Sequence, residues 1–508
     1  MSSPSEPEKY SIDDMMERLK NRPAEDPIEY GQLVTRPDGS QAVRVRKRKR
    51  RSHQPVKEER ARQRRARMFQ ISGFLILLFA GLIAAGVALA YANTPTFREG
   101  LVRKISASSG ARVDLQRFRV NPTYAVADWL SLDWPGGNAL QNLSLRGIKA
   151  NLHPVSFLGR SVRGEEMLVQ EATLNLREPQ GGVPLWEGPA ASGTDTAVRF
   201  DQYTIPKLNV IFGDRATSPV QIWGSEATFV SANRNGRPEL LLNKGDLAAS
   251  GWPKLRIHRA YIDFSGKQVN LVSLRLMHET DSTGIFELSG TIFPYPPGRA
   301  SELSVLLDDY PVSGIAGPEF GLLFAGRIDT QPATGSNRLT FTPGHDAAAS
   351  LSVTFSCPGK SLELSGFPML SGLSQALDDE WFLRPDFDTE AGGLLRRADG
   401  SVEIENLKLE SKDRMALRGG VTMNPARQLS GDLEVGLAEG MIKASGSRRL
   451  DAMFSPPREG YRWLTVRIGG SAGSPADNFK ELYESSTSAP PATPERGVPS
   501  FDDLTRPK

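Results

Sequence analysis

Residues 140–176, LQNLSLRGIKANLHPVSFLGRSVRGEEMLVQEATLNL, alternate apolar and polar side chains on both sides of a glycine-containing turn. A period of two is typical of β-strands, in which successive side chains point to opposite faces of a sheet. Such a sheet has one apolar face and one polar face. The same alternation precedes this stretch in VDLQRFRV (113–120) and YAVADWLSLDW (124–134). The sequence therefore predicts a series of neighbouring strands.

The alternation returns after residue 197 in short runs bounded by turn residues. These runs are VRFDQYTIPKLNVIF (198–212), VQIWGSEATFV (220–230), LRIHRAYIDF (255–264), VNLVSLRL (269–276) and GIFELSGTIF (284–293). Helical patterns in the same region are few, and we expect them only at 371–382 and 476–483. We predict a mainly β fold: an elongated, curled antiparallel sheet with a groove-like face and few short helices.

Two internal echoes suggest that strand units repeat. Residues 273–292 resemble residues 406–421, with Gly290 and Gly419 in matching places. In the second echo, LDDYP precedes Gly314 and LSGFP precedes Gly372. Repeats of this kind favour an elongated array in which each unit packs on its neighbours.

A helix and a membrane anchor precede the first strands. Residues 96–109 have helical spacing of apolar side chains, with Thr94 as a possible cap, Pro95 in the first turn and Gly110 at the end. Before it, ISGFLILLFAGLIAAGVALAYA (71–92) carries no charge and exceeds the roughly 20 residues that cross a hydrocarbon core of about 30 Å. The anchor prediction includes Ile71, Leu75, Phe79, Leu82, Val87 and Tyr91.

The flank of this segment predicts its orientation. Residues 44–67 hold thirteen Lys and Arg against Glu58 and Glu59, a charge of about +11 that leaves the remainder near −8. By the positive-inside rule the N-terminus is cytoplasmic and the body lies across the membrane. The cations assigned to topology and lipid-headgroup contact are Arg46, Lys47, Arg48, Lys49, Arg50, Arg51, Arg64, Arg65 and Arg67. Their position beside a bilayer favours phospholipid over nucleic acid.

Composition indicates the compartment, and patterning indicates the boundaries. A single cysteine, Cys357, excludes an intramolecular disulfide framework, and an exported domain without disulfides suits a bacterial envelope. With the orientation above, we expect a single-pass protein of the bacterial inner membrane whose body is periplasmic. The predicted parts are a basic, largely disordered cytoplasmic arm (1–67), the transmembrane helix (68–94), a first β domain with its leading helix (95–180), a linker (181–197), a β-rich repeat body (198–483) and a disordered tail (484–508). Within the arm, a short helix at 10–20 and a hairpin at 30–45 make residues 11–45 a candidate site for a cytoplasmic partner.

The sequence contains no pattern typical of catalysis. Its five histidines are scattered without metal-ligand spacing. Asp308–Asp309 and Asp378–Glu380 do not form a calcium loop of alternating oxygens with a central glycine. No serine lies in a nucleophile elbow, and Cys357 precedes a proline at a strand end. We expect no catalytic residue, cofactor or metal.

The order of elements resembles the AsmA-like family of bacterial envelope proteins. The resemblance lies in the anchor, a short helix ending in Ser-Gly-Ala-Arg-Val, the strands of 140–176 around their Leu-Gly turn, and DGSVEIENLKLES (399–411). The sequence departs from the family at Pro184-Leu185-Trp186, where Asn-Trp is usual. The resemblance implies a non-enzymatic role in handling or transferring lipid during envelope and outer-membrane biogenesis.

An apolar strand face is the candidate lipid surface. Its candidate lipid-facing residues are Leu143, Leu145, Leu152, Leu168, Leu174 and Leu176, in stripes interrupted near Gly147. Three alternatives stay open at this point: the apolar faces close into an ordinary core, the body is a scaffold for other envelope proteins, or the chain carries a signal across the membrane.

Overall fold

The computed structural model describes residues 32–44, 54–134, 140–153, 162–177, 198–212, 220–233, 236–249, 251–265, 268–293, 299–330, 337–342, 349–357 and 362–486. The predicted helix at 10–20, the cluster at 46–51, the linker at 181–197 and residues 487–508 of the predicted tail lie outside these ranges. The chain divides into two compact units, 1–83 and 84–508.

The first unit contains the hairpin that the sequence predicts. Strands β1 (Gln32–Thr35) and β2 (Gln41–Arg44) pair in antiparallel fashion. Asp38 stabilises the turn because its carboxylate accepts hydrogen bonds from the Ser40 backbone N–H at 3.1 Å and from the Ser40 hydroxyl at 2.7 Å.

Helix α2 (Gln54–Ala92) is longer than predicted. Its stretch Ser72–Ala92 is long and apolar enough to cross a membrane, and 71 residues precede it in the sequence. The helix begins at Gln54, so it includes residues 54–67 of the predicted arm. That stretch consists mainly of Lys, Glu, Arg, Gln and Ala, which are strong helix formers.

Helix α3 (Pro95–Ser109) confirms the predicted leading helix and its caps. The Thr94 hydroxyl accepts a hydrogen bond from the Phe97 N–H at 3.3 Å, Pro95 lies in the first turn, and Gly110 ends the helix at φ 69°. The chain then enters the first strand directly.

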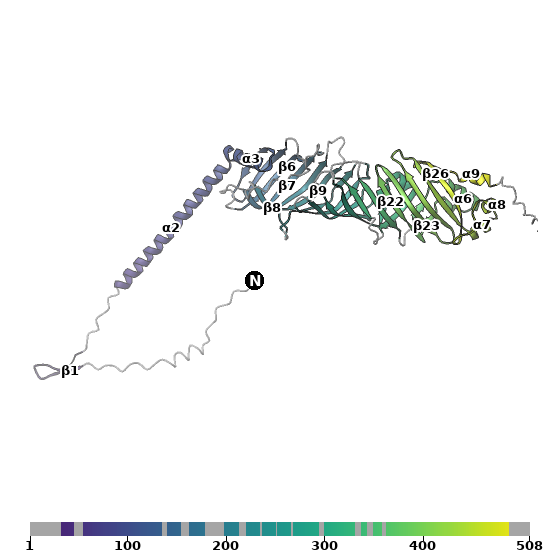
Figure 1. Cartoon of the computed structure of the whole chain (residues 1–508). Helices are drawn as coiled ribbons and strands as arrows, with labels where there is room; N and C mark the ends of the chain where they lie inside the picture. The colour runs from purple at the N-terminus through teal and green to yellow at the C-terminus, as the bar shows by residue number, and fades with distance from the viewer. Residues whose placement is uncertain are drawn as a thin grey trace, which may run out of the picture. The chain divides into compact units, whose positions relative to one another are not determined.

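The second unit is built on one long sheet (Figure 1). Its strands are β3 (Arg112–Gln116), β4 (Arg119–Val120), β5 (Tyr124–Asp133), β6 (Leu140–Leu152), β7 (Val162–Leu176), β8 (Val198–Phe212), β9 (Val220–Val230), β10 (Glu239–Asn243), β11 (Asp246–Ala249), β12 (Leu255–Ser265), β13 (Gln268–His278), β14 (Ile285–Ile292), β15 (Ser301–Asp308), β18 (Arg338–Phe341), β19 (Ser350–Ser356), β22 (Glu390–Ala398), β23 (Ser401–Ser411), β24 (Met415–Met423), β25 (Leu429–Ala438), β26 (Tyr461–Ser471) and β27 (Ser474–Asp477). The fold is therefore mainly β, as predicted.

Neighbours in this sheet follow the chain closely. β3 and β4 both pair with β5, and β10 and β11 together bridge β9 and β12. β15 continues through β18 and β19 to β22, and the order then runs on to β27. At about 4.8 Å per strand, the path along the sheet is roughly 85 Å.

One pair departs from the predicted antiparallel arrangement. β7 and β8 are parallel, from Val162 opposite Val198 to Leu176 opposite Phe212. Parallel neighbours need a crossover of a dozen or more residues, and 21 residues separate the two strands in the sequence. The alternation pattern is the same for both directions, which is why the sequence did not distinguish them.

Short elements pack on the later part of the sheet. They are β16 (Tyr310–Pro311), α4 (Ser313–Ala316), α5 (Pro318–Leu323), β17 (Phe324–Thr330), β20 (Leu362–Leu364), α6 (Pro368–Leu377), the 3₁₀ helix η3 (Glu380–Leu383), β21 (Asp386–Phe387), α7 (Glu439–Ser445), α8 (Arg448–Met453) and α9 (Phe479–Ser485). The two predicted helices correspond to α6 with η3, and to α9. The prediction of no others is wrong, because α4, α5, α7 and α8 are too short to show a helical period.

The core differs between the two ends of the sheet. From Leu255 to Phe479 a single large cluster contains fully buried aromatic side chains, including Phe324 and Phe382. Before Leu255 the buried clusters are smaller and contain mostly Ala, Leu and Val. The second half of the apolar face is thus closed, whereas the first half is covered less completely.

Candidate functional site

An apolar strip crosses the early strands on one face of the sheet. Its members are directly opposed from strand to strand: Leu132, Leu143, Leu174, Val210, Ile222, Leu247 and Leu255, from β5 to β12. Leu132 and Leu255 at its ends are buried, while the five residues between them are half-buried. A second line of Leu140, Leu176, Phe212, Val220 and Ala249 runs beside it. Together these two lines are called the apolar strip below.

A third line on the same face is rich in aromatic side chains. It consists of Met167, Tyr203, Phe229, Leu240 and Ile262, each opposite the next. All five are half-buried. The Tyr203 and Phe229 rings lie 5.8 Å apart between centroids, and Phe229 contacts the ring of Phe264 at 6.3 Å. This aromatic line extends the apolar surface towards the strand ends that lie beside the last turn of α2.

The predicted lipid-facing residues separate into three groups. Leu143, Leu145, Leu174 and Leu176 lie on the face of the apolar strip. Leu152 is buried, with only 7% of its surface exposed. Leu168 is opposite Lys149 and Thr204, and its neighbours Met167 and Val169 contact the apolar core, so its side chain lies on the other face.

The interruption predicted near Gly147 is a break in strand alternation. Gly147 has φ 60°, a conformation that favours glycine, and the side chains of Leu145 and Ile148 on either side of it contact the same core. A Cβ at Gly147 would meet the Gln170 side chain at 2.5 Å. The irregularity therefore keeps the apolar side chains on one face along the whole of β6.

The end of α2 packs where the aromatic line begins. Ala92 and Phe200 are fully buried in a cluster with Leu152, against which Met167 and Tyr203 also pack. The Asn93 side chain accepts a hydrogen bond from the Val120 N–H and donates to the Val120 carbonyl, both at 2.8 Å. The apolar face is thus continuous with the last turn of the candidate membrane helix.

Most of that helix exposes its apolar side chains. Of the predicted anchor residues, Leu75, Phe79, Leu82, Val87 and Tyr91 are each about half or more exposed, between 46% and 64%. The Ile71 side chain and those of Arg64, Arg65 and Arg67 are not among the described ones. Surface of this kind is unfavourable in water and favourable in hydrocarbon.

A buried cation lies where the large core begins, beyond β12. Arg397 on β22 is 8% exposed and donates hydrogen bonds to the carbonyls of Ile315 and Gly251. Its guanidinium lies 4.8 Å from the centroid of the Trp252 ring. Burial lowers the pKa of Arg397 from its ordinary value. These contacts join the chain before β12 to α4 and β22, at the junction with the large core.

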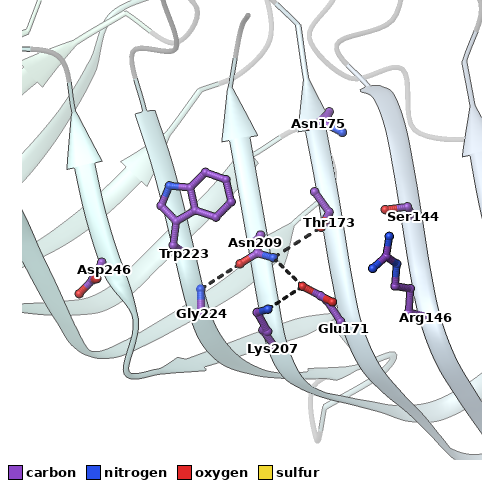
Figure 2. A pocket seen from close by; sticks show the side chains of 10 residues that line it. All are labelled: Ser144, Arg146, Glu171, Thr173, Asn175, Lys207, Asn209, Trp223, Gly224 and Asp246. Atoms are coloured by element: carbon purple, nitrogen blue, oxygen red, sulfur yellow. Dashed lines mark hydrogen bonds and ion pairs between the residues drawn. The ribbon is translucent and has the colours of Figure 1, made fainter. Parts of the chain in front are cut away.

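The opposite face of the same strands carries a polar trough of about 590 Å³ (Figure 2). It is lined by Ser144, Arg146, Glu171, Thr173, Asn175, Lys207, Asn209, Trp223, Gly224 and Asp246. Most of them alternate along their strands with side chains of the apolar face, as Thr173 and Asn175 do with Leu174 and Leu176. Figure 2 shows Arg146 and Ser144 at one side of the trough and Trp223 at the other.

Hydrogen bonds fix the floor of the trough. Asn209 is 5% exposed; its Nδ2 donates to Glu171 at 3.4 Å, and its Oδ1 accepts from the Gly224 N–H at 3.0 Å. Lys207 lies 2.8 Å from the Glu171 carboxylate and, as the largest cause, lowers the pKa of that carboxyl. Asp246 pairs with Lys254 at 3.2 Å, and the guanidinium of Arg146 lies 4.9 Å from the Trp129 ring centroid.

Sequence reasoning missed this trough because its residues come from five strands. Only the alternation could have grouped them, as the polar partners of the predicted apolar stripes. Within the described ranges, no three His, Cys, Asp or Glu residues cluster closely enough to hold a metal ion. Cys357 is buried. No protein-family model, curated protein or solved structure matches the chain.

Proposed function

We propose that this chain is a single-span membrane protein whose β-sheet binds acyl chains of membrane phospholipid on the apolar strip and the aromatic line. In this proposal the protein is a non-enzymatic, AsmA-like component of the bacterial inner membrane. The N-terminus is cytoplasmic and the body lies in the periplasm, where it handles lipid during envelope biogenesis.

The observation that supports this proposal most strongly is the incomplete covering of the apolar strip and the aromatic line between β5 and β12. These lines lie on either side of a buried row that includes Val169, Ala172 and Leu208. Removing apolar surface from water contributes about 25 cal/mol per Å², so an incompletely covered apolar face favours an apolar occupant. Further along the sheet, equivalent apolar side chains are fully covered by other parts of the chain. A need for stability alone would favour the same closure throughout.

Continuity with α2 favours lipid as the occupant over another protein. The aromatic line begins at the cluster that contains Ala92, the last residue of the candidate span. The first line of the strip covers six strand steps, or roughly 29 Å, while one leaflet of a 30 Å hydrocarbon core is about 15 Å thick. The strip is thus long enough for the extended acyl chain of one lipid.

A lipid-extraction assay tests this proposal. The full chain is reconstituted in vesicles that contain a phospholipid with a fluorescent acyl chain and a quencher lipid confined to the bilayer. We expect fluorescence to rise as the body removes labelled lipid from the quencher. Phe229→Asp should reduce this rise at least about fivefold, because it places a charge on the aromatic line.

Thr228→Asp is the matched control, because Thr228 is the neighbour of Phe229 on the opposite face of β9. It should leave the fluorescence rise unchanged, and circular dichroism should show intact β structure in both variants. The proposal is wrong if the unaltered chain produces no rise, or if both variants behave alike.

A further inference from the structure

The polar trough has the features of a binding site with its own ligand. Its volume of about 590 Å³ lies within the range of 300–1,000 Å³ that is usual for small-molecule sites. It opens on the face opposite the apolar strip, so an acyl chain on the strip does not reach it. The ligand of the trough must therefore be identified from the trough's own chemistry.

Most of the charges in the trough already have partners within the protein. The Lys207 ammonium is paired with Glu171, and Asp246 is paired with Lys254. Arg146 makes its cation–π contact with Trp129. A phosphate or carboxylate ligand would have to compete with these pairs, whereas an uncharged ligand with many hydroxyl groups would leave them intact.

Trp223 supplies an apolar surface inside this polar setting. Trp223 is 38% exposed, and its Nε1 donates a hydrogen bond to Gln221 at 3.0 Å. The exposed surface is thus the ring itself, whose negative π face attracts C–H groups. Ser144 and Arg146 lie on the other side of the trough (Figure 2). They are three strand steps from Trp223, or about 14 Å.

We propose that the trough binds a neutral oligosaccharide. One sugar ring packs on the indole of Trp223, and hydroxyl groups of the next sugars form hydrogen bonds with Thr173, Asn175 and Arg146. A sugar presents a C–H face and a rim of hydroxyl groups, so it matches one aromatic surface followed by polar side chains. Asn209 and Gly224 hold the floor in position and do not contact the ligand in this arrangement.

Binding to defined oligosaccharides tests this inference. The full chain in lipid nanodiscs is titrated with maltotriose, cellotriose and chitotriose by calorimetry, and with inorganic phosphate as the charged alternative. We expect at least one trisaccharide to bind saturably, and phosphate at equal concentration neither to bind nor to compete. Trp223→Ala should weaken binding at least tenfold, and Arg146→Gln should weaken it less.

Val272→Ala, which replaces an exposed apolar residue on β13 outside the trough, is the control and should bind as the unaltered chain does. The inference is overturned if none of the three trisaccharides binds, if Trp223→Ala binds as tightly as the control, or if phosphate displaces the sugar. None of these outcomes affects the lipid-extraction result, because Phe229 and Trp223 lie on opposite faces of β9.

Discussion

At the scale of single residues, Asn93 joins the candidate membrane helix to the sheet. Its side chain makes three hydrogen bonds at 2.8–2.9 Å, two with the Val120 backbone and one with the Leu89 carbonyl. The amide group of Asn93 both accepts from the Val120 N–H and donates to the Val120 carbonyl. An aliphatic side chain can do neither, and a shorter polar side chain does not reach both groups. This contact fixes where the apolar face begins relative to the last turn of α2.

Replacing Asn93 should loosen this connection locally. Asn93→Ala removes hydrogen bonds worth about 0.5–1.5 kcal/mol each, so we expect amide exchange at Val120 to accelerate about tenfold or more. Hydrogen exchange of the full chain in detergent, read by mass spectrometry, measures this rate. Asn151→Ala, an exposed position on β6, is the control. Unchanged protection at Val120 would show that packing alone holds the helix end.

Asp281 is a second residue with a specific electrostatic role. Hydrogen bonds from the Thr283 N–H at 2.9 Å and hydroxyl at 2.7 Å, together with the neighbouring Arg327 guanidinium, lower the pKa of its carboxyl to about 2. A depressed pKa stabilises the folded state above the unfolded value of 3.8, and this stability is lost as pH falls towards 2.

The predicted effect of Asp281→Asn therefore depends on pH. Above pH 4 the variant should be less stable by about 1 kcal/mol, after allowance for solvent screening of a side chain that is 28% exposed. Between pH 4 and pH 2 the difference should shrink towards zero. Thermal unfolding in detergent at pH 5, 4, 3 and 2 measures it, with exposed Asp308→Asn as the control. A difference that stays constant over this range would contradict the assignment.

At the scale of elements, the internal echo has a structural counterpart. Gly290 on β14 and Gly419 on β24 both have positive φ, 147° and 131°, and each is paired with a leucine of the following strand. In each case the preceding strand pair contains an irregular register. Both glycines therefore lie where the backbone of the following strand comes close to their own strand. This shared feature supports the prediction of repeated strand units.

Gly419→Ala should be strongly destabilising, because a Cβ there would meet the Asp432 carbonyl oxygen at 2.2 Å. We expect a loss of about 2 kcal/mol or more in the free energy of unfolding, from backbone displacement and the positive φ. Gly469→Ala on the nearby β26 is the control, since a Cβ there has no neighbour within 4 Å. Chemical denaturation followed by circular dichroism compares them. Equal midpoints would mean that the close approach carries no energetic cost.

Elements with a sustained pattern were predictable, and their arrangement was not. The limits of β8 and β9 and the caps of α3 follow from alternation, Thr94 and Gly110, all of which are local signals. The parallel direction of β8 and the short helices α7 and α8 depend on contacts distant in sequence. The trough was hidden for the same reason, because Arg146 and Trp223 come to line one trough only after four strands have paired.

At the scale of the whole molecule, one sheet serves two different purposes. Its later strands enclose a large core, and the Arg397 contacts mark where that closure begins. Its earlier strands present a half-covered apolar face that begins beside the last turn of α2, and a polar trough on the opposite face. The apolar face is closed in the later half of the sheet and only partly covered in the earlier half. This difference is the basis of the proposal that lipid occupies the earlier half.

Site-specific photocrosslinking to lipid tests that central claim most directly. A photoreactive phenylalanine is placed at Leu174 or Phe229 on the apolar face, at Thr173 or Thr228 beside them on the other face, and at Leu82 in α2 as a positive control. The full chain is irradiated in vesicles of radiolabelled phospholipid. We predict lipid adducts at Leu174, Phe229 and Leu82, and at least tenfold less labelling at the two threonine positions. Labelling at Leu82 alone, or equal labelling of both faces, would contradict lipid binding by the sheet.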